Sequence, residues 1–161
     1  MLKLDDRDLR MLAILREEGR VSKADLAKRI NLSAAPCWER LKRLEDAGII
    51  VGYRAEVSLR KIAAHIVVLM AVELEQHRAE DFALFERAIA PLDEIVTCWA
   101  VGGGFDYIMQ IVTRDIDSYQ RLVDHLLEAR TGIARYFTYV VTKPVKQSAG
   151  LPFDLLIGGK G

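Results

Sequence analysis

The sequence has no apolar run long enough to cross a membrane. A spanning helix needs about 20 consecutive apolar residues, and no stretch of the 161 residues approaches that length. The acidic pair Asp5 and Asp6 is also unlike a secretory signal peptide, which opens with basic residues followed by an apolar segment. We therefore expect a protein that works in the cytoplasm.

Cysteine and histidine are scarce. The two cysteines, Cys37 and Cys98, are far apart in segments that we expect to be packed, which argues against a disulfide framework or a zinc site. We expect both to be small buried apolar residues. The histidines His65, His77 and His125 have no acidic or cysteine neighbours at metal-binding spacing. We therefore expect no metal site and no cofactor.

Catalytic motifs are missing as well. No nucleophile motif is present, and the glycine run 102–104 lacks the Lys-Ser/Thr ending of a phosphate-binding loop. We therefore expect no enzymatic activity.

The net charge is zero, with 23 basic and 23 acidic residues, but the charge is unevenly distributed. From Arg20 to Arg54 there are eight bases and four acids, a local charge of +4, so the remainder carries −4. A basic segment on a neutral chain favours an anion-binding module joined to another part, although a solvated charged surface would give the same count.

Three short helical patterns occupy the first fifty residues. The first begins at Asp5, a capping residue, and ends at Gly19. Its expected apolar stripe is Leu9, Leu12, Ala13 and Leu15. The second begins at Ser22, with Asp25 three residues later as in a capping box. Its expected inward residues are Leu26, Ala27 and Ile30.

The third pattern follows a short turn at 31–33, the connection typical of a helix-turn-helix. Ser33 is its expected cap, Pro36 falls in its first turn, and Gly48 stands where a left-handed residue ends a helix. Its buried stripe should be Cys37, Leu41 and Leu44. Its exposed side should carry Ala34, Ala35, Trp38, Glu39, Lys42 and Arg43.

These faces are typical of a helix that enters the DNA major groove. Small residues near its start would allow close approach to base edges, while long basic residues would reach phosphates. The candidate DNA-binding residues are Arg20, Ser22, Ser33, Ala34, Ala35, Pro36, Trp38, Glu39, Arg40, Lys42 and Arg43. Two alternatives remain open: Trp38 packs partly against the first helix, or the three helices form a small protein-binding bundle.

The rest of the chain alternates strands and helices. Segment 49–57 is β-prone and predicts a wing or connecting strand. Strands are expected at 65–74, 95–101, 107–112 and 133–142, with helices along 82–92 and 116–126. This βαββαβ order is the ferredoxin-like arrangement, with both helices on one face of an antiparallel sheet. We predict an α+β fold: an N-terminal winged helix-turn-helix plus a C-terminal ferredoxin-like βαββαβ domain.

The predicted domain limits follow from these elements. Residues 1–52 form the helix-turn-helix domain, 53–63 a linker strand or hinge, 64–146 the ferredoxin-like domain for ligand sensing and oligomerisation, and 147–161 a tail. Apolar residues follow one another at 66–70 and 107–109, so both faces of the sheet need cover. Because two helices cover only one face, we expect a homodimer that presents two recognition helices to two DNA half-sites.

Several motifs in order resemble those of the leucine-responsive/asparagine-responsive (Lrp/AsnC) transcription regulators of bacteria and archaea. They are Leu4-Asp5-x-x-Asp8, Gly19-Arg20-Val21-Ser22, Leu32-Ser33-Ala34-Ala35-Pro36-Cys37, Arg40-Leu41-Lys42-Arg43-Leu44-Glu45, Gly48-Ile49-Ile50-x-Gly52-Tyr53, Gly102-Gly103-Gly104-Phe105-Asp106-Tyr107, and Thr138-Tyr139-Val140-Val141 with Val145-Lys146-Gln147-Ser148. The resemblance covers nearly the whole chain and implies double-stranded DNA and a small-molecule effector, such as an amino acid, as partners. It also implies dimers that assemble into octamers.

The sequence departs from the family pattern at three places. Ala35 replaces a common hydroxyl residue, Gly103 or Gly104 stands where an acidic or polar residue is common, and Thr131-Gly132 replaces a frequent Pro-Gly. These departures put the operator and the identity of the effector in doubt.

An amino-acid effector needs hydrogen-bond donors for its carboxylate beside an acceptor for its ammonium. The glycine amides of 102–104 could bind the carboxylate and Asp106 the ammonium. Alternatively, the glycines only form a tight hairpin that Asp106 caps; the resemblance, which places effectors near this loop, makes the two interpretations comparable. The candidate effector-binding residues are Gly102, Gly103, Gly104, Asp106, Ile116, Tyr139 and Val140, of which the last three are equally plausible as core. A small-molecule-sensing interaction module that does not bind DNA is the alternative function.

Overall fold

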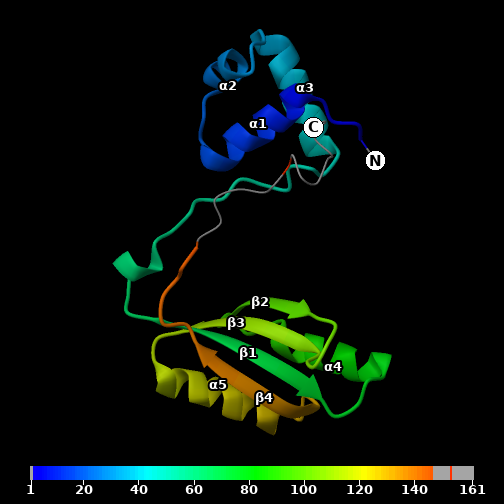
Figure 1. The fold of residues 1–161 in the computed structure, drawn as a ribbon, viewed down its shortest axis with the longest axis vertical. Helices are drawn as coiled ribbons and strands as arrows, with labels where there is room; N and C mark the ends of the chain where they lie inside the picture. Colours follow the sequence, from blue (N-terminus) through cyan, green and yellow to red (C-terminus); the bar gives the residue numbers. More distant parts are fainter. Residues whose placement is uncertain (1, 147–152, 154–161) are drawn as a thin grey trace. The chain divides into compact units, whose positions relative to one another are not determined.

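A computed structural model of the chain describes residues 2–146 and Phe153, arranged in two compact units (Figure 1). The first contains the described residues up to Val57 together with Lys146 and Phe153, and the second contains Ser58–Val145. Each unit has its own buried core. Within the described part of the chain, no helix is long and apolar enough to span a membrane.

The first unit consists of three helices, α1 (Asp6–Glu17), α2 (Lys23–Arg29) and α3 (Ala34–Asp46). The predicted caps of the first two are confirmed. The Asp5 side chain accepts from the Asp8 amide while the Asp8 side chain accepts from the Asp5 amide, and Ser22 accepts from the Asp25 amide. Ser33 occupies the cap position of α3, but the prediction that its side chain caps the helix was wrong. The third residue of α3 is Pro36, which has no amide hydrogen for a cap to bind.

The core of the first unit is built by all three helices. Its buried apolar members are Met11, Leu12, Ile14, Leu26, Ala27, Ile30, Cys37, Leu41 and Leu44. The prediction for α1 was partly wrong, because Ala13 is exposed and Leu9 and Leu15 are half-buried. The inward stripe of α1 begins at Asp8, a fully buried carboxylate, and a pattern of apolar residues alone gives no reason to place a charge there.

The predicted end of α3 is confirmed, whereas the strand predicted after it is absent from the structure. Gly48 has a φ of +66°, the left-handed conformation expected of a residue that ends a helix. The amides of Ile49 and Ile50 both donate to the Leu44 carbonyl, so the chain leaves α3 in a tight turn. The strand predicted at 49–57 was wrong, since these residues form no strand and have no partner strand to pair with. A 3₁₀ turn, η1 (Leu59–Lys61), follows.

The second unit confirms the predicted βαββαβ order. Its elements are β1 (Ile66–Leu74), α4 (Ala79–Ile89), β2 (Ile95–Ala100), β3 (Tyr107–Thr113), α5 (Ile116–Glu128) and β4 (Ile133–Val140). The strands form one sheet in the order β2-β3-β1-β4, and every pairing is antiparallel (Figure 1).

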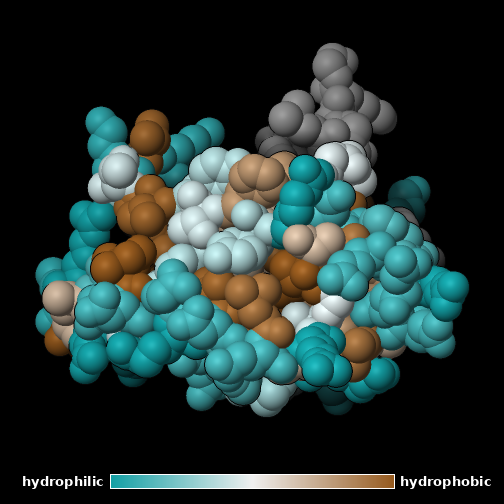
Figure 2. All heavy atoms as spheres, turned by 90° about the horizontal axis from the view of Figure 1, so that it is seen from below, coloured by the Kyte–Doolittle hydropathy of each residue, from teal (hydrophilic) through white to brown (hydrophobic). Residues whose placement is uncertain are grey.

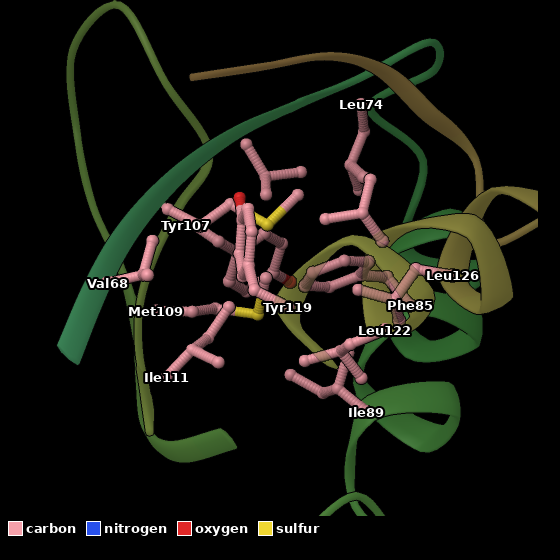
Figure 3. Close-up of a cluster of buried hydrophobic side chains, with 13 residues drawn as sticks. Val68, Leu74, Phe85, Ile89, Tyr107, Met109, Ile111, Tyr119, Leu122 and Leu126 are labelled. Atoms are coloured by element: carbon pink, nitrogen blue, oxygen red, sulfur yellow. The ribbon is translucent and has the colours of Figure 1, made fainter. Parts of the chain in front are cut away.

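Both helices of this unit pack against the same face of the sheet. Every second side chain of β1 and β3 points into the core, where it packs against side chains of α4 and α5. Figure 3 shows the strand and helix side chains pointing toward one another. Phe85 of α4 lies at the centre, 0% exposed, with its ring centroid 4.6 Å from that of Tyr107. The buried cluster is Val68, Met70, Val72, Leu74, Phe85, Ile89, Tyr107, Met109, Ile111, Tyr119, Leu122, Val123 and Leu126.

Candidate DNA-binding face and effector site

The two sides of α3 separate as predicted. Cys37, Leu41 and Leu44 are buried on the core side. The opposite side exposes Ala34, Ala35, Trp38, Glu39 and Lys42, with Ser33 exposed just before the helix and Pro36 half-buried. Lys42 makes no ion pair with any residue that the structure describes. Small side chains near the start of the helix and a free lysine one turn further on give a surface that can approach a groove and its phosphates.

Arg40 and Arg43 differ from the other candidates, because α1 holds both. The Arg40 Nη1 donates to Asp5 Oδ2 at 2.7 Å and to Asp8 Oδ1 at 2.8 Å, and the Arg43 Nη2 donates to Asp8 Oδ2 at 2.6 Å. The Asp8 side chain is 1% exposed, against 24% for Arg40 and 43% for Arg43. The hydrogen bonds that Arg40 donates to Asp5 and Asp8 raise the pKa of Arg40. The hydrogen bond from the Asp8 amide, and to a smaller extent the one from Arg40, lowers the pKa of Asp5.

Trp38 is half-exposed, and the side chain of Lys23 lies over its ring. The Lys23 Nζ lies 3.4 Å from the centroid of the indole ring, a cation–π contact worth about 0.5–1 kcal/mol at an exposed position. Lys23 is the first residue of α2, so this contact joins Trp38 to α2. The alternative that Trp38 also packs partly against α1 stays a prediction. Periodicity within α3 carries no signal for this contact.

Arg20 and Ser22 lie at the connection between α1 and α2. Both are exposed. The Ser22 hydroxyl is already used twice, since it accepts from the Asp25 amide and donates to the Asp25 carboxylate at 2.7 Å. Its role in the structure is to begin α2, and DNA contact by either residue remains a prediction.

The glycine run lies in the connection between β2 and β3. All three glycines are exposed, and a Cβ added to any of them would meet nothing within 4 Å. Only Gly103, with a φ of +142°, adopts a conformation that side-chain-bearing residues rarely take. The space beside the three glycines is therefore open among the described residues, as binding of a small ligand would require.

Asp106 closes this loop. Its amide donates to the Val72 carbonyl and its carbonyl accepts from the Val101 amide, both at 2.9 Å. Its carboxylate accepts from the Leu74 amide at 2.8 Å and lies 3.2 Å from the His77 Nε2. These contacts match the capping interpretation of Asp106. His77, which is exposed beside the carboxylate, was not singled out from the sequence because 29 residues separate the two.

Two of the three expected wall residues, Tyr139 and Val140, lie on opposite faces of the sheet. Ile116, Tyr139 and Val140 are 54%, 54% and 48% exposed, so of the two interpretations the one that places them in the core was wrong. Tyr139 pairs with Leu69 and Val140 with Val68, and consecutive strand residues point to opposite faces of a sheet. Tyr139 and Val140 therefore cannot line the same side of one pocket in a single chain.

The sheet face opposite the helices is largely apolar, and neither α4 nor α5 covers it. The alternation of the strands places on it Val67, Leu69, Ala71, Trp99, Ile108, Val112, Phe137 and Tyr139. Leu69, Trp99 and Phe137 are 37%, 48% and 40% exposed. Phe105 packs edge-on against Phe137, with ring centroids 5.3 Å apart. On the face of the molecule drawn in Figure 2, apolar side chains gather in brown areas between hydrophilic ones. We call these eight residues the open sheet face.

Burial raises the pKa of both cysteine thiols, which disfavours their reactive thiolate form. Cys37 is buried as predicted, whereas Cys98 is only half-buried. Burial raises the pKa of the Cys98 thiol to about 11, with the Glu86 carboxylate contributing, so the thiol stays protonated near neutral pH. No group of three metal-ligating side chains occurs among residues 2–146 and 153.

Comparison with known proteins decides the family. The Lrp/AsnC ligand binding domain matches residues 67–151, more than half of the chain. The chain belongs to the Lrp/AsnC family. A second match, to a winged helix-turn-helix DNA-binding domain, covers residues 4–51. The protein is thus a DNA-binding transcriptional regulator of the Lrp/AsnC family with a ligand-binding domain.

Similar proteins extend over nearly the full length of this Lrp/AsnC chain. The transcriptional regulatory protein DoeX of Halomonas elongata is 47% identical over 95% of the chain and 98% of the relative. The leucine-responsive regulatory protein of Escherichia coli K12 is 37% identical, over 90% of the chain and 88% of the relative. A solved transcriptional regulator of Neisseria meningitidis, in complex with L-Met, has a TM-score of 0.88 at 29% identity, covering 96% of this chain and 99% of its own.

Proposed function

We propose that this regulator binds specific DNA sequences as a homodimer through α3, and that an α-amino acid changes its affinity for DNA. The observation that carries the proposal is the exposed side of α3, where Ala34, Ala35 and Lys42 face outward while the opposite stripe fixes the helix to its domain. An α-helix fits the B-DNA major groove, and residues near the start of a recognition helix contact base edges.

The open sheet face supports the homodimer. A large group of exposed apolar side chains marks an interaction site, and a twofold arrangement lets one self-complementary surface cover itself. A dimer would also present two α3 helices to two half-sites about one turn of DNA apart. Assembly beyond the dimer into octamers stays a prediction from the family resemblance, and most of the tail at 147–161 lies outside the described residues.

The glycine loop and Asp106 support an amino-acid effector. The similar regulator of Neisseria meningitidis was solved in complex with L-Met. In the present chain, the exposed glycine amides could receive a carboxylate beside the Asp106 carboxylate. Since Tyr139 and Val140 lie on opposite faces of the sheet, a pocket that both of them line would need a second copy of the chain. An effector shared between copies would couple ligand binding to assembly and hence to DNA affinity.

Replacing Lys42 with methionine tests the DNA-binding face. DNA duplexes selected from a random pool by the wild-type protein serve as the probe, and affinity is measured by fluorescence anisotropy at several salt concentrations. Each neutralised phosphate contributes about 0.9 to the slope of log affinity against log salt. We expect Lys42→Met to lower this slope by about 0.9 per protomer, while Lys61→Met, a charge removed from the second unit, leaves it unchanged. A wild-type protein without salt-dependent duplex binding would instead fit the interaction module.

Replacing Asp106 with asparagine tests the effector site. Asparagine keeps a side-chain oxygen for the Leu74 amide but removes the charge that would pair with an ammonium group. Calorimetric titration with L-Met and the other common amino acids should show binding weakened about tenfold or more, the usual loss for a charge-assisted hydrogen bond. Asp93→Asn, at an exposed position before β2, is the control. Equal binding by wild type and Asp106→Asn would remove Asp106 from the site.

A further inference from the structure

Two basic residues of α3 meet one buried carboxylate of α1. Both oxygens of Asp8 accept a guanidinium hydrogen bond, from Arg40 at 2.8 Å and from Arg43 at 2.6 Å. Arg40 also reaches Asp5 at 2.7 Å. Because Asp8 is 1% exposed, its charge is removed from water and depends on the two arginines for compensation. We call these four residues the Asp8 clamp.

The clamp is electrically neutral. Two arginines face two aspartates, so their charges sum to zero, and the charge of +4 counted over 20–54 overstates what DNA would meet, because Asp5 and Asp8 lie outside that segment. Lys42 lies between the two arginines in the sequence but is exposed on the other side of the helix, with no ion pair among the described residues. Adjacent positions on α3 thus differ in their electrostatic environment.

We propose that Arg40 and Arg43 are positioning residues that orient the recognition helix through Asp8, and that they do not neutralise DNA phosphates. This proposal rests on α3 being the helix that reads DNA. A guanidinium binds a carboxylate through directed hydrogen bonds, so the clamp fixes both the rotation of α3 and its distance from α1. Base readout needs placement to within about 0.5 Å, and the apolar stripe of Cys37, Leu41 and Leu44 alone would tolerate larger shifts.

A positioning role and a phosphate contact predict different binding data. A lost phosphate contact weakens binding to all sequences and lowers the salt slope by about 1. A misplaced recognition helix weakens binding to the selected duplex, leaves binding to a scrambled duplex unchanged, and leaves the salt slope unchanged. General destabilisation would lower the active fraction equally for both duplexes, so the ratio of the two affinities separates positioning from loss of fold.

The experiment compares Arg40→Met and Arg43→Met with Lys42→Met, using the selected and scrambled duplexes at several salt concentrations. Circular dichroism confirms folding at the assay temperature. We expect both arginine variants to bind the selected duplex about tenfold more weakly than the wild type, a loss comparable to that of one mismatched base pair. Their salt slope and their affinity for the scrambled duplex should equal those of the wild type. Asp8→Asn, which cannot touch a phosphate, should give the same loss of specificity. Combining it with Arg43→Met should add little, because the two act through one contact.

Arg43→Lys keeps the test decisive if the methionine variants unfold. Lysine retains the charge that a phosphate needs but not the planar fork that binds Asp8, so a positioning role predicts reduced specificity and a phosphate contact predicts wild-type behaviour. If Lys42→Met lowers the salt slope and Arg43→Met lowers it equally, the positioning role is wrong and the proposed function stands. If Lys42→Met leaves the slope unchanged, Lys42 does not contact a phosphate. If, in addition, every variant binds the selected and scrambled duplexes as the wild type does, α3 does not read DNA and both proposals fail.

Discussion

Phe137→Glu is expected to convert the proposed dimer into monomers. Phe137 lies on the open sheet face, 40% exposed and packed against Phe105. In a twofold interface the substitution enters twice, and each carboxylate would be buried without a partner, at a cost of several kcal/mol. Even about 3 kcal/mol raises the dissociation constant of the dimer about 100-fold, which sedimentation equilibrium measures directly.

The matched control for this substitution is Leu84→Glu. Leu84 on α4 is 43% exposed, close to the value for Phe137, but does not belong to the open sheet face. We expect Leu84→Glu to remain dimeric. Monomeric Phe137→Glu should also bind a single half-site with much lower apparent affinity than the wild type binds the selected duplex, because the second half-site is no longer tethered. A dimeric Phe137→Glu would show that another surface joins the subunits.

Phe85→Ala is expected to destabilise the second unit by about 3–5 kcal/mol, the usual range for deleting a fully buried phenylalanine side chain. Phe85 is 0% exposed and its ring packs 4.6 Å from that of Tyr107, so both core volume and an aromatic contact are lost. Urea unfolding followed by tryptophan fluorescence measures the loss. The chain has two tryptophans, Trp38 in the first unit and Trp99 in the second, so a Trp38→Phe background makes the signal specific to the second unit.

Leu84→Ala provides the comparison for this prediction. The two positions are adjacent on α4, but Leu84 is exposed and loses little packing when shortened. We expect it to change the free energy of unfolding by less than about 1 kcal/mol. Similar losses for the two variants would mean that Phe85 is not in the core. In a Trp99→Phe background, Trp38 should report an unchanged first unit.

The sequence predicted the second unit well because its signals are local. Strand and helix limits agree with the structure to within a few residues, and the apolar runs in β1 and β3 foretold a sheet with two apolar faces. The strand at 49–57 was wrong because β-propensity describes how a residue packs in a sheet, and no neighbouring strand is available there. The stripe of α1 was misplaced because a buried aspartate occupies one of its positions.

The candidate site was predicted in outline and not in its contacts. The spacing of Cys37, Leu41 and Leu44 was enough to separate the two faces of α3. The partners of its charged and aromatic residues come from other elements: Asp8 lies 32 residues before Arg40, and Lys23 comes from α2. A single sequence gives no direct signal for such pairs, because helical periodicity extends only along one element. A charge on the apolar side of α1 is the one hint that a basic partner was required.

Phe153 packs against an N-terminal core although it lies late in the sequence. Its side chain is partly buried against the core of the three N-terminal helices, although the entire second unit precedes it in the sequence. The ribosome therefore adds this apolar side chain to the first unit only after the second unit has been translated. Until that moment, the core of the first unit in a nascent chain lacks the contact that Phe153 makes.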